Sequence, residues 1–177
     1  MREPVTADRI REFARALASQ TNAEVRIYLT GGATAVLRGW RPTTLDIDLK
    51  IVPDSDPVLR ALPDLKEKLR LNVELASPDD FLPDLPGWQD RSAFIVREGM
   101  ISFFHYDPYA QALAKIERGH EQDLHDVARA IAEGLVDRRR LKELFESIEP
   151  RLYRFPAIDP KTLRRAVEAI CAEDRTG

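Results

Sequence analysis

The sequence predicts an α+β fold, in which a small mixed β-sheet is flanked by helices and followed by a helical C-terminal part. In the first 106 residues, segments rich in β-branched and aromatic residues alternate with amphipathic segments of helical period. A Glu-Gly turn at residues 98–99 separates two apolar segments, which predicts a β-hairpin over residues 92–106. Only helical patterns follow. We therefore predict a core over residues 1–106 and a helical subdomain over residues 107–177, packed on that core.

The predicted core alternates between helix and strand. A first helix begins at Thr6 or Asp8, because either side chain can cap it, and polar residues 20–22 end it. A proline-rich loop over residues 77–88 is typical of a unit boundary. The predicted strands are 24–30, 45–52 and 71–76, and the further predicted helices are 33–39 and 57–71.

Helices account for the remainder of the chain. Asp107 followed by Pro108 is a strong helix start, since aspartate caps free amides and proline fits the first helical position. Gly119 ends this helix. Three more amphipathic segments predict helices over residues 121–133, 137–147 and 160–173.

Composition excludes several classes of function. The chain carries 27 Lys and Arg against 30 Asp and Glu, a net charge of −3, so nucleic-acid binding would need a local basic patch. One cysteine and three scattered histidines assemble neither a disulfide framework nor a Cys/His zinc site. Because no segment resembles a signal peptide or a membrane helix, we expect a cytoplasmic protein with no membrane partner.

Two acidic residues interrupt an otherwise apolar strand. Over residues 45–52, Leu45 and every second residue after it are apolar, whereas Asp46, Asp48 and Lys50 point to the other face. Residues two apart on a strand lie roughly 6.5 Å apart, so both carboxylates can bind one divalent cation or bracket two. A solvated face on which Lys50 relieves the repulsion explains the same pattern.

A second feature lies upstream, where the strand over residues 24–30 ends in Gly31-Gly32. Free amides at such a strand-to-helix turn are a common way to hold phosphate, and Thr30 and Thr34 add hydroxyl donors. A tight turn that needs positive φ explains the glycines equally well. Together, a phosphate-binding turn and a carboxylate pair are the two halves of a site for a metal–nucleoside triphosphate complex.

These residues resemble the nucleotidyltransferase superfamily, the polymerase-β-like group, in which a Gly-Gly turn, a short helix and then Asp-x-Asp occur in this order. The matching stretch is "TGGATAVLRGWRPTTLDIDL". Its "RPTTLDID" part, which begins at Arg41, looks like the minimal bacterial nucleotidyltransferases of the AbiEii/MenT toxin-like type and related domains of unknown function. The resemblance implies a small nucleotidyltransferase core, metal binding by Asp46 and Asp48, and Arg41 among the nucleotide-binding residues.

The later stretch "ALAKIERGHEQDLHDV" also resembles those toxin-like proteins. The resemblance implies that Lys115 contacts nucleotide phosphates and that Arg118 holds the triphosphate or an acidic neighbour. It implies that Asp123 or Asp126 orients the lysine or assists a catalytic base. Two acids near a helix start are also favoured by the helix dipole alone.

Other candidates are less specific. Many superfamily members carry a third carboxylate on a following strand, and Glu74 in "LNVELA" is the matching acid here, ahead of Asp79 and Asp80. His105 and His125 could exchange protons near neutral pH. A basic group could guide an RNA acceptor, and it comprises residues 138–142 with Arg151, Arg154, Arg164 and Arg165.

The function that the resemblance implies is Mg²⁺- or Mn²⁺-dependent transfer of a nucleoside monophosphate from a nucleoside triphosphate to an acceptor hydroxyl. The acceptor class is RNA, such as tRNA, or protein, and a cognate antitoxin protein is an expected partner. Two alternatives stay open. One is a metal-dependent nuclease, since residues 48–50 have the Asp-x-Lys form. The other is a nucleotidyltransferase-fold protein that binds a partner without turnover.

Overall fold

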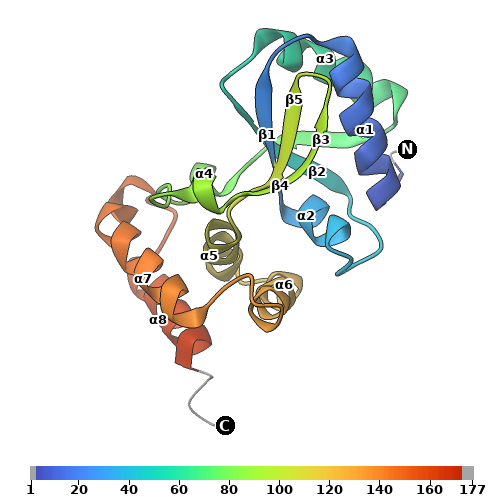
Figure 1. Cartoon of the computed structure of the whole chain (residues 1–177). Helices are drawn as coiled ribbons and strands as arrows, with labels where there is room; N and C mark the ends of the chain where they lie inside the picture. Colours follow the sequence, from blue (N-terminus) through green and yellow to red (C-terminus); the bar gives the residue numbers. More distant parts are fainter. Residues whose placement is uncertain (1–2, 173–177) are drawn as a thin grey trace. The chain divides into compact units, whose positions relative to one another are not determined.

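The structure, a computed structural model, describes residues 3–172. Its tertiary contacts divide the chain into two compact units (Figure 1). The first unit comprises the chain up to Ser77 together with Ser92–Tyr106, and the second comprises Pro78–Arg91 and the chain from Asp107 onward. The sequence predicted a boundary between residues 106 and 107, which is also a boundary here, but the loop over residues 78–91 groups with the helical unit.

The first unit contains a five-stranded mixed sheet in the order β3-β2-β1-β5-β4. β1 pairs antiparallel with β2 and parallel with β5, β2 pairs parallel with β3, and β4 and β5 form the predicted hairpin. The predicted α+β class with a small mixed sheet is confirmed. The strands are β1 (Val25–Thr30), β2 (Asp46–Val52), β3 (Asn72–Leu75), β4 (Ala93–Glu98) and β5 (Ile101–His105).

Three helices accompany this sheet, namely α1 (Ala7–Gln20), α2 (Gly31–Leu37) and α3 (Asp56–Lys68). Thr6 caps α1, because its hydroxyl oxygen accepts a hydrogen bond from the Arg9 amide at 3.3 Å. α2 begins at Gly31, two residues earlier than the sequence predicted, so the diglycine lies inside its first turn.

The core of this unit lies on one face of the sheet. Ile47 and Leu49 of β2 are buried there together with apolar residues of α1 and α3, such as Phe13 and Leu62. The other face of β2 carries half-buried polar residues. Leu45 departs from the predicted alternation, since it precedes β2 and is 74% exposed.

The second unit is helical. Its main helices are α5 (Pro108–Arg118), α6 (Glu121–Ala132), α7 (Arg138–Ile148) and α8 (Pro160–Ala172), and its shorter ones are η1 (Pro78–Asp80), α4 (Trp88–Arg91) and η2 (Glu149–Arg154). Asp107 caps α5 through the Tyr109 amide, as predicted, and its buried carboxylate also accepts two hydrogen bonds from Arg91. This ion pair ties the 78–91 loop to α5, which explains why the loop belongs to this unit.

Within residues 3–172, no helix has the length and apolar character required to cross a membrane.

Candidate functional site

Asp46 and Asp48 project from β2 on the face opposite the core. Burial alternates along this strand, with Ile47 and Leu49 buried and the two aspartates half-buried. The period of two therefore places both carboxylates on one face, as the sequence predicted.

The Asp48 carboxylate lies against the backbone of Gly31. The antiparallel register pairs Thr30 with Asp48, so the residue after Thr30 turns directly past this side chain. A Cβ atom on Gly31 would lie 2.8 Å from Asp48 Oδ2, and the φ of Gly31 is +60°. Glycine is required here for two reasons, the left-handed backbone and the close carboxylate.

Gly32 serves a different contact. A Cβ atom on Gly32 would overlap the hydroxyl of Thr44, a residue of the loop between α2 and β2. Thr44 is held there by two backbone hydrogen bonds with Val5, of 2.7 and 3.0 Å. The second glycine thus allows this loop to pack on the turn, and this packing accounts for a glycine at position 32. Sequence reasoning did not single out Thr44.

The hydroxyl groups of Thr30 and Thr34 have internal partners. Thr30 Oγ1 donates to the Ala76 carbonyl and Thr34 Oγ1 donates to the Leu29 carbonyl, each at 3.2 Å, and both residues are buried. Neither bond involves the first-turn amides of α2, for which Thr30 provides no side-chain cap. These hydroxyls fix the turn in this structure. Their predicted contact with phosphate stays a prediction, and it would require them to leave their carbonyl partners.

His105 lies on the other side of the same turn. The parallel register pairs Leu29 with His105, whose Nδ1 lies 3.3 Å from Thr34 Oγ1. The Thr34 hydroxyl donates its proton to the Leu29 carbonyl, so it can only accept from His105. His105 Nδ1 is therefore the donor, and the imidazole is the Nδ1–H tautomer. Burial, and secondarily the charge of Arg38, lowers the pKa of His105 from 6.5 to about 4. The imidazole is therefore neutral at pH 7.

Asn72 connects two of the predicted acids. Register places Asn72 beside Asp46 and Glu74 beside Asp48 on the parallel pair β2 and β3. The Asn72 side-chain nitrogen donates one hydrogen bond to Asp46 Oδ1 and another, of 2.8 Å, to Glu74 Oε1. Within residues 3–172, no three His, Cys, Asp or Glu side chains are grouped closely enough to hold a metal ion. The role of Glu74 as a third metal ligand stays a prediction.

The second predicted cluster lies on α5 and α6 of the other unit. Lys115 Nζ is 2.6 Å from Asp126 Oδ2 and 3.8 Å from Asp123 Oδ1, and all three residues are buried. Arg118 donates two hydrogen bonds to Asp123. Burial acts to raise the pKa of Asp123, but the Arg118 hydrogen bonds and the charges of Arg118 and Lys115 outweigh it, so the pKa is lowered.

A family model described as "Nucleotidyltransferase of unknown function (DUF6036)" matches residues 8–170 of the chain. The chain belongs to this family. The match covers both units, and it confirms the predicted membership of the nucleotidyltransferase superfamily.

A comparison with solved structures found a protein with a similar fold to this nucleotidyltransferase family member. It is an antigenic nucleotidyltransferase-like protein from Paracoccidioides brasiliensis, with 15% sequence identity and a TM-score of 0.50. The similarity covers 94% of this chain and 95% of that chain. At such low identity it shows the fold alone. The search of curated proteins found no match.

The predicted site residues of this nucleotidyltransferase family member form two groups, one in each unit. In the first unit, Asp48 meets Gly31, and Asp46 is joined to Glu74 through Asn72. In the second unit, α5 and α6 bring together Lys115, Arg118, Asp123 and Asp126. Sequence reasoning missed Asn72. Its signal was its place two residues before Glu74 in a predicted strand, which puts both on one face.

The remaining candidates are a loop arginine, a histidine of α6 and a set of basic residues. Arg41 is half-buried in the loop between α2 and β2, and His125 is exposed on α6. Several of the predicted basic residues are neutralised by acids: Arg139 and Arg140 pair with Glu143, Arg151 with Asp84, and Arg164 with Glu149 and Glu168. The roles of Arg41 and of a basic RNA-guiding surface stay predictions.

Proposed function

We propose that this protein transfers a nucleoside monophosphate from a nucleoside triphosphate to an acceptor hydroxyl, with Mg²⁺ or Mn²⁺ as its cofactor. The observation that carries the proposal is the contact between the Asp48 carboxylate and the backbone of Gly31. It brings a carboxylate, which is a group that can bind a cation, beside a turn whose first residue has no side chain. The positive φ of Gly31 favours glycine in any case, and the close carboxylate is a second and separate reason for it.

The donor chemistry of the β2 face fits a hard divalent cation. Asp46 and Asp48 supply carboxylate oxygens, which Mg²⁺ prefers. We propose that these two aspartates bind the cation and that Glu74 moves toward them to act as a third ligand, since the described residues contain no ready group of three such side chains. When bound, the cation would stabilise negative charge on phosphate oxygens.

The reaction that we propose is an in-line displacement. The acceptor oxygen forms a bond to the α-phosphorus, the bond from that phosphorus to the bridging oxygen breaks, and pyrophosphate leaves. The hydroxyl proton passes to a carboxylate, for which we propose Glu74. Asn72 donates to Glu74 Oε1 and thereby fixes the orientation of this base. The amides of the Gly31-Gly32 turn would hold the triphosphate, with Thr30, Thr34 and Arg41 in support.

The cluster on α5 and α6 enters the proposal through the resemblance. Lys115 is held in a defined rotamer by Asp126 and Asp123, which would limit the entropy lost when its ammonium contacts a phosphate. Arg118 would hold Asp123 in place, since it donates hydrogen bonds to this acid. For the acceptor we propose RNA, such as tRNA, or a protein, and for the macromolecular partner a cognate antitoxin.

Incubation with each α-³²P-labelled nucleoside triphosphate and a cell extract tests the proposal. We expect label to appear on RNA or protein and to require Mg²⁺ or Mn²⁺. Asp48→Asn should reduce transfer at least about 100-fold, because it removes charge at the proposed cation site. Asp54→Asn is the matched control, since Asp54 is exposed just beyond β2, and it should keep full transfer.

Other outcomes of this experiment would contradict the proposal. RNA that is shortened without triphosphate would identify a nuclease. Asp48 and Lys50, on one face of β2, would then be its candidate catalytic residues. Triphosphate that binds without any transfer of label would identify a binding protein. Transfer that survives Asp48→Asn would mean that the site lies elsewhere.

A further inference from the structure

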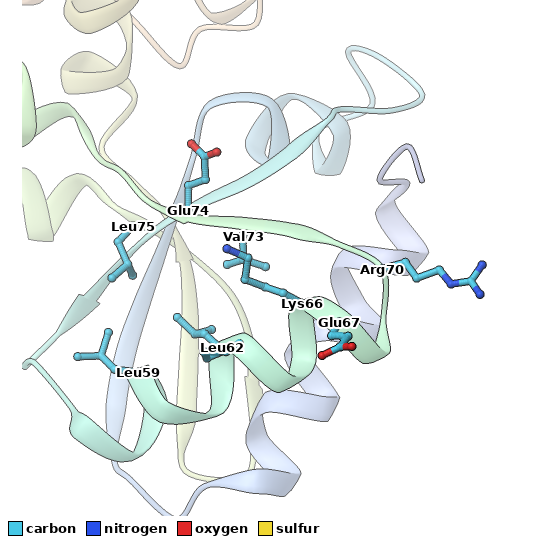
Figure 2. A pocket seen from close by; sticks show the side chains of 9 residues that line it. Leu59, Leu62, Lys66, Glu67, Arg70, Val73, Glu74 and Leu75 are labelled. Atoms are coloured by element: carbon cyan, nitrogen blue, oxygen red, sulfur yellow. The ribbon is translucent and has the colours of Figure 1, made fainter. Parts of the chain in front are cut away.

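A groove of about 820 Å³ runs between α3 and β3 in the first unit (Figure 2). Leu62 and Val73, both buried, form its floor. Leu59 and Leu75 border it, and they are 37% and 56% exposed. The groove therefore combines a buried apolar floor with leucines that remain open to solvent.

One wall of the groove is the edge of the sheet. β3 is the first strand in the order β3-β2-β1-β5-β4, and within residues 3–172 no strand pairs with its outer side. Edge strands present backbone groups that can pair with a further strand. Their alternate side chains would then enter pockets beside the edge, which is the basis of recognition by strand addition.

The groove also contains a lysine without a counter-ion. Lys66 of α3 is half-buried, and within the described part of the chain it has no carboxylate within 4.0 Å. Figure 2 shows its side chain extending from α3 toward β3 beside Val73. The nearby Arg70 does have an acidic partner, since its Nη1 lies 3.8 Å from Glu3 Oε1. An acidic group from a bound molecule would therefore complement Lys66.

A second copy of this chain does not supply that group through the same edge. Figure 2 shows Val73 and Leu75 on the side of β3 that faces α3, whereas the side chain of Glu74, which also lines the groove, extends from the opposite side of the strand. Two β3 edges in contact would leave both lysines without an acid. The acid that complements Lys66 would therefore come from a segment other than β3.

We propose that this groove binds an extended segment of a partner protein that adds as a strand to the β3 edge. The segment places an apolar side chain between Leu59 and Leu75 and an acidic side chain against Lys66. These two side chains lie on the same face of the added strand, so they are two or four residues apart in its sequence. This inference does not depend on the proposed transfer reaction.

Selection from a displayed library of random 12-residue peptides on the immobilised full chain tests this proposal. We expect enriched peptides with an apolar and an acidic residue at spacing two or four. Leu75→Arg should weaken their binding at least tenfold, and Lys66→Glu should select a basic residue in place of the acid. Hydrogen exchange of residues 72–75 should slow when a selected peptide is added, because their outer amides become paired.

Leu124→Arg is the matched control, because Leu124 is 42% exposed on α6, and it should leave peptide binding unchanged. Absence of any enriched peptide, or equal binding to the Leu75→Arg protein, would overturn the proposal. So would a wild-type dimer in sedimentation that Leu75→Arg converts to a monomer, since the groove would then be an interface between copies. Thermal melting of each variant separates lost binding from lost folding.

Discussion

Asp46 and Glu74 on the sheet have different hydrogen-bond partners from Asp123 and Asp126 on α6. Asp46 and Glu74 accept hydrogen bonds from the neutral Asn72 amide. Asp126 and Asp123 are buried and accept hydrogen bonds from Lys115 and Arg118. An amide orients a carboxylate without neutralising it, whereas a buried cation compensates its charge. The first arrangement leaves the negative charge of these carboxylates uncompensated by Asn72, and the second compensates it with Lys115 and Arg118.

This contrast predicts its largest effect on stability in the second unit. Asp126→Asn leaves the buried Lys115 with Asp123, whose Oδ1 is 3.8 Å from Lys115 Nζ, as its remaining charged partner among the described residues. We expect the free energy of unfolding to fall by about 3 kcal/mol, as is typical when one partner of a buried pair is removed. Urea unfolding measures this loss. Asp46→Asn should change stability far less, and equal losses in the two variants would remove the distinction between the clusters.

The next effect concerns His105, beside the turn of the first unit. The folded-state pKa of about 4 lies below the ordinary value of 6.5, so between these values only the unfolded chain binds the proton. The contribution of His105 to stability is therefore full above pH 6.5 and is lost as the pH falls to 4. We expect the free energy of unfolding to decrease by up to about 3 kcal/mol over this window.

Denaturant unfolding at several pH values, with matched histidine variants, isolates this effect. His105→Gln should remove the decrease between pH 6.5 and 4. The exposed His125 provides the control, and His125→Gln should leave the decrease in place. A decrease that is the same in wild-type protein and His105→Gln would show that other groups cause it.

A smaller effect separates the two reasons for glycine in the turn. Gly31 and Gly39 both have positive φ, +60° and +77°, but a Cβ atom meets Asp48 only at Gly31, whereas the space around Gly39 is open. Gly39→Ala should therefore cost about 1 kcal/mol of stability from backbone strain alone. Gly31→Ala should cost about 1 kcal/mol more and also displace the Asp48 carboxylate. Thermal unfolding compares the two, and equal costs would mean that the carboxylate moves away without penalty.

Much of the first unit follows from local sequence pattern. The period of two over residues 46–52 specifies which face of β2 carries Asp46 and Asp48, and the diglycine specifies where β1 ends. The role of Asn72 does not follow from any local pattern, because it depends on the register between β2 and β3, whose residues are 26 apart. Long-range pairing also decides the environment of His105.

The second unit illustrates a further limit. The cap at Asp107 follows from the sequence, since aspartate before proline is favoured at a helix start. The association of residues 78–91 with this unit does not, because it depends on the buried ion pair between Arg91 and Asp107, 16 residues apart. The sequence predicts that Thr30 and Thr34 add hydroxyl donors to the turn, and it does not reveal that the backbone carbonyls of Ala76 and Leu29 accept these hydrogen bonds.

Binding of Mn²⁺ together with a non-hydrolysable nucleoside triphosphate tests the central claim most directly, since it requires no knowledge of the acceptor. Paramagnetic resonance reports the bound ion. We predict that the wild-type protein and Asp54→Asn bind Mn²⁺ with the same affinity and that Asp48→Asn binds it at least tenfold more weakly. Equal affinity in the wild-type protein and Asp48→Asn would contradict the assignment of the β2 face as the cation site.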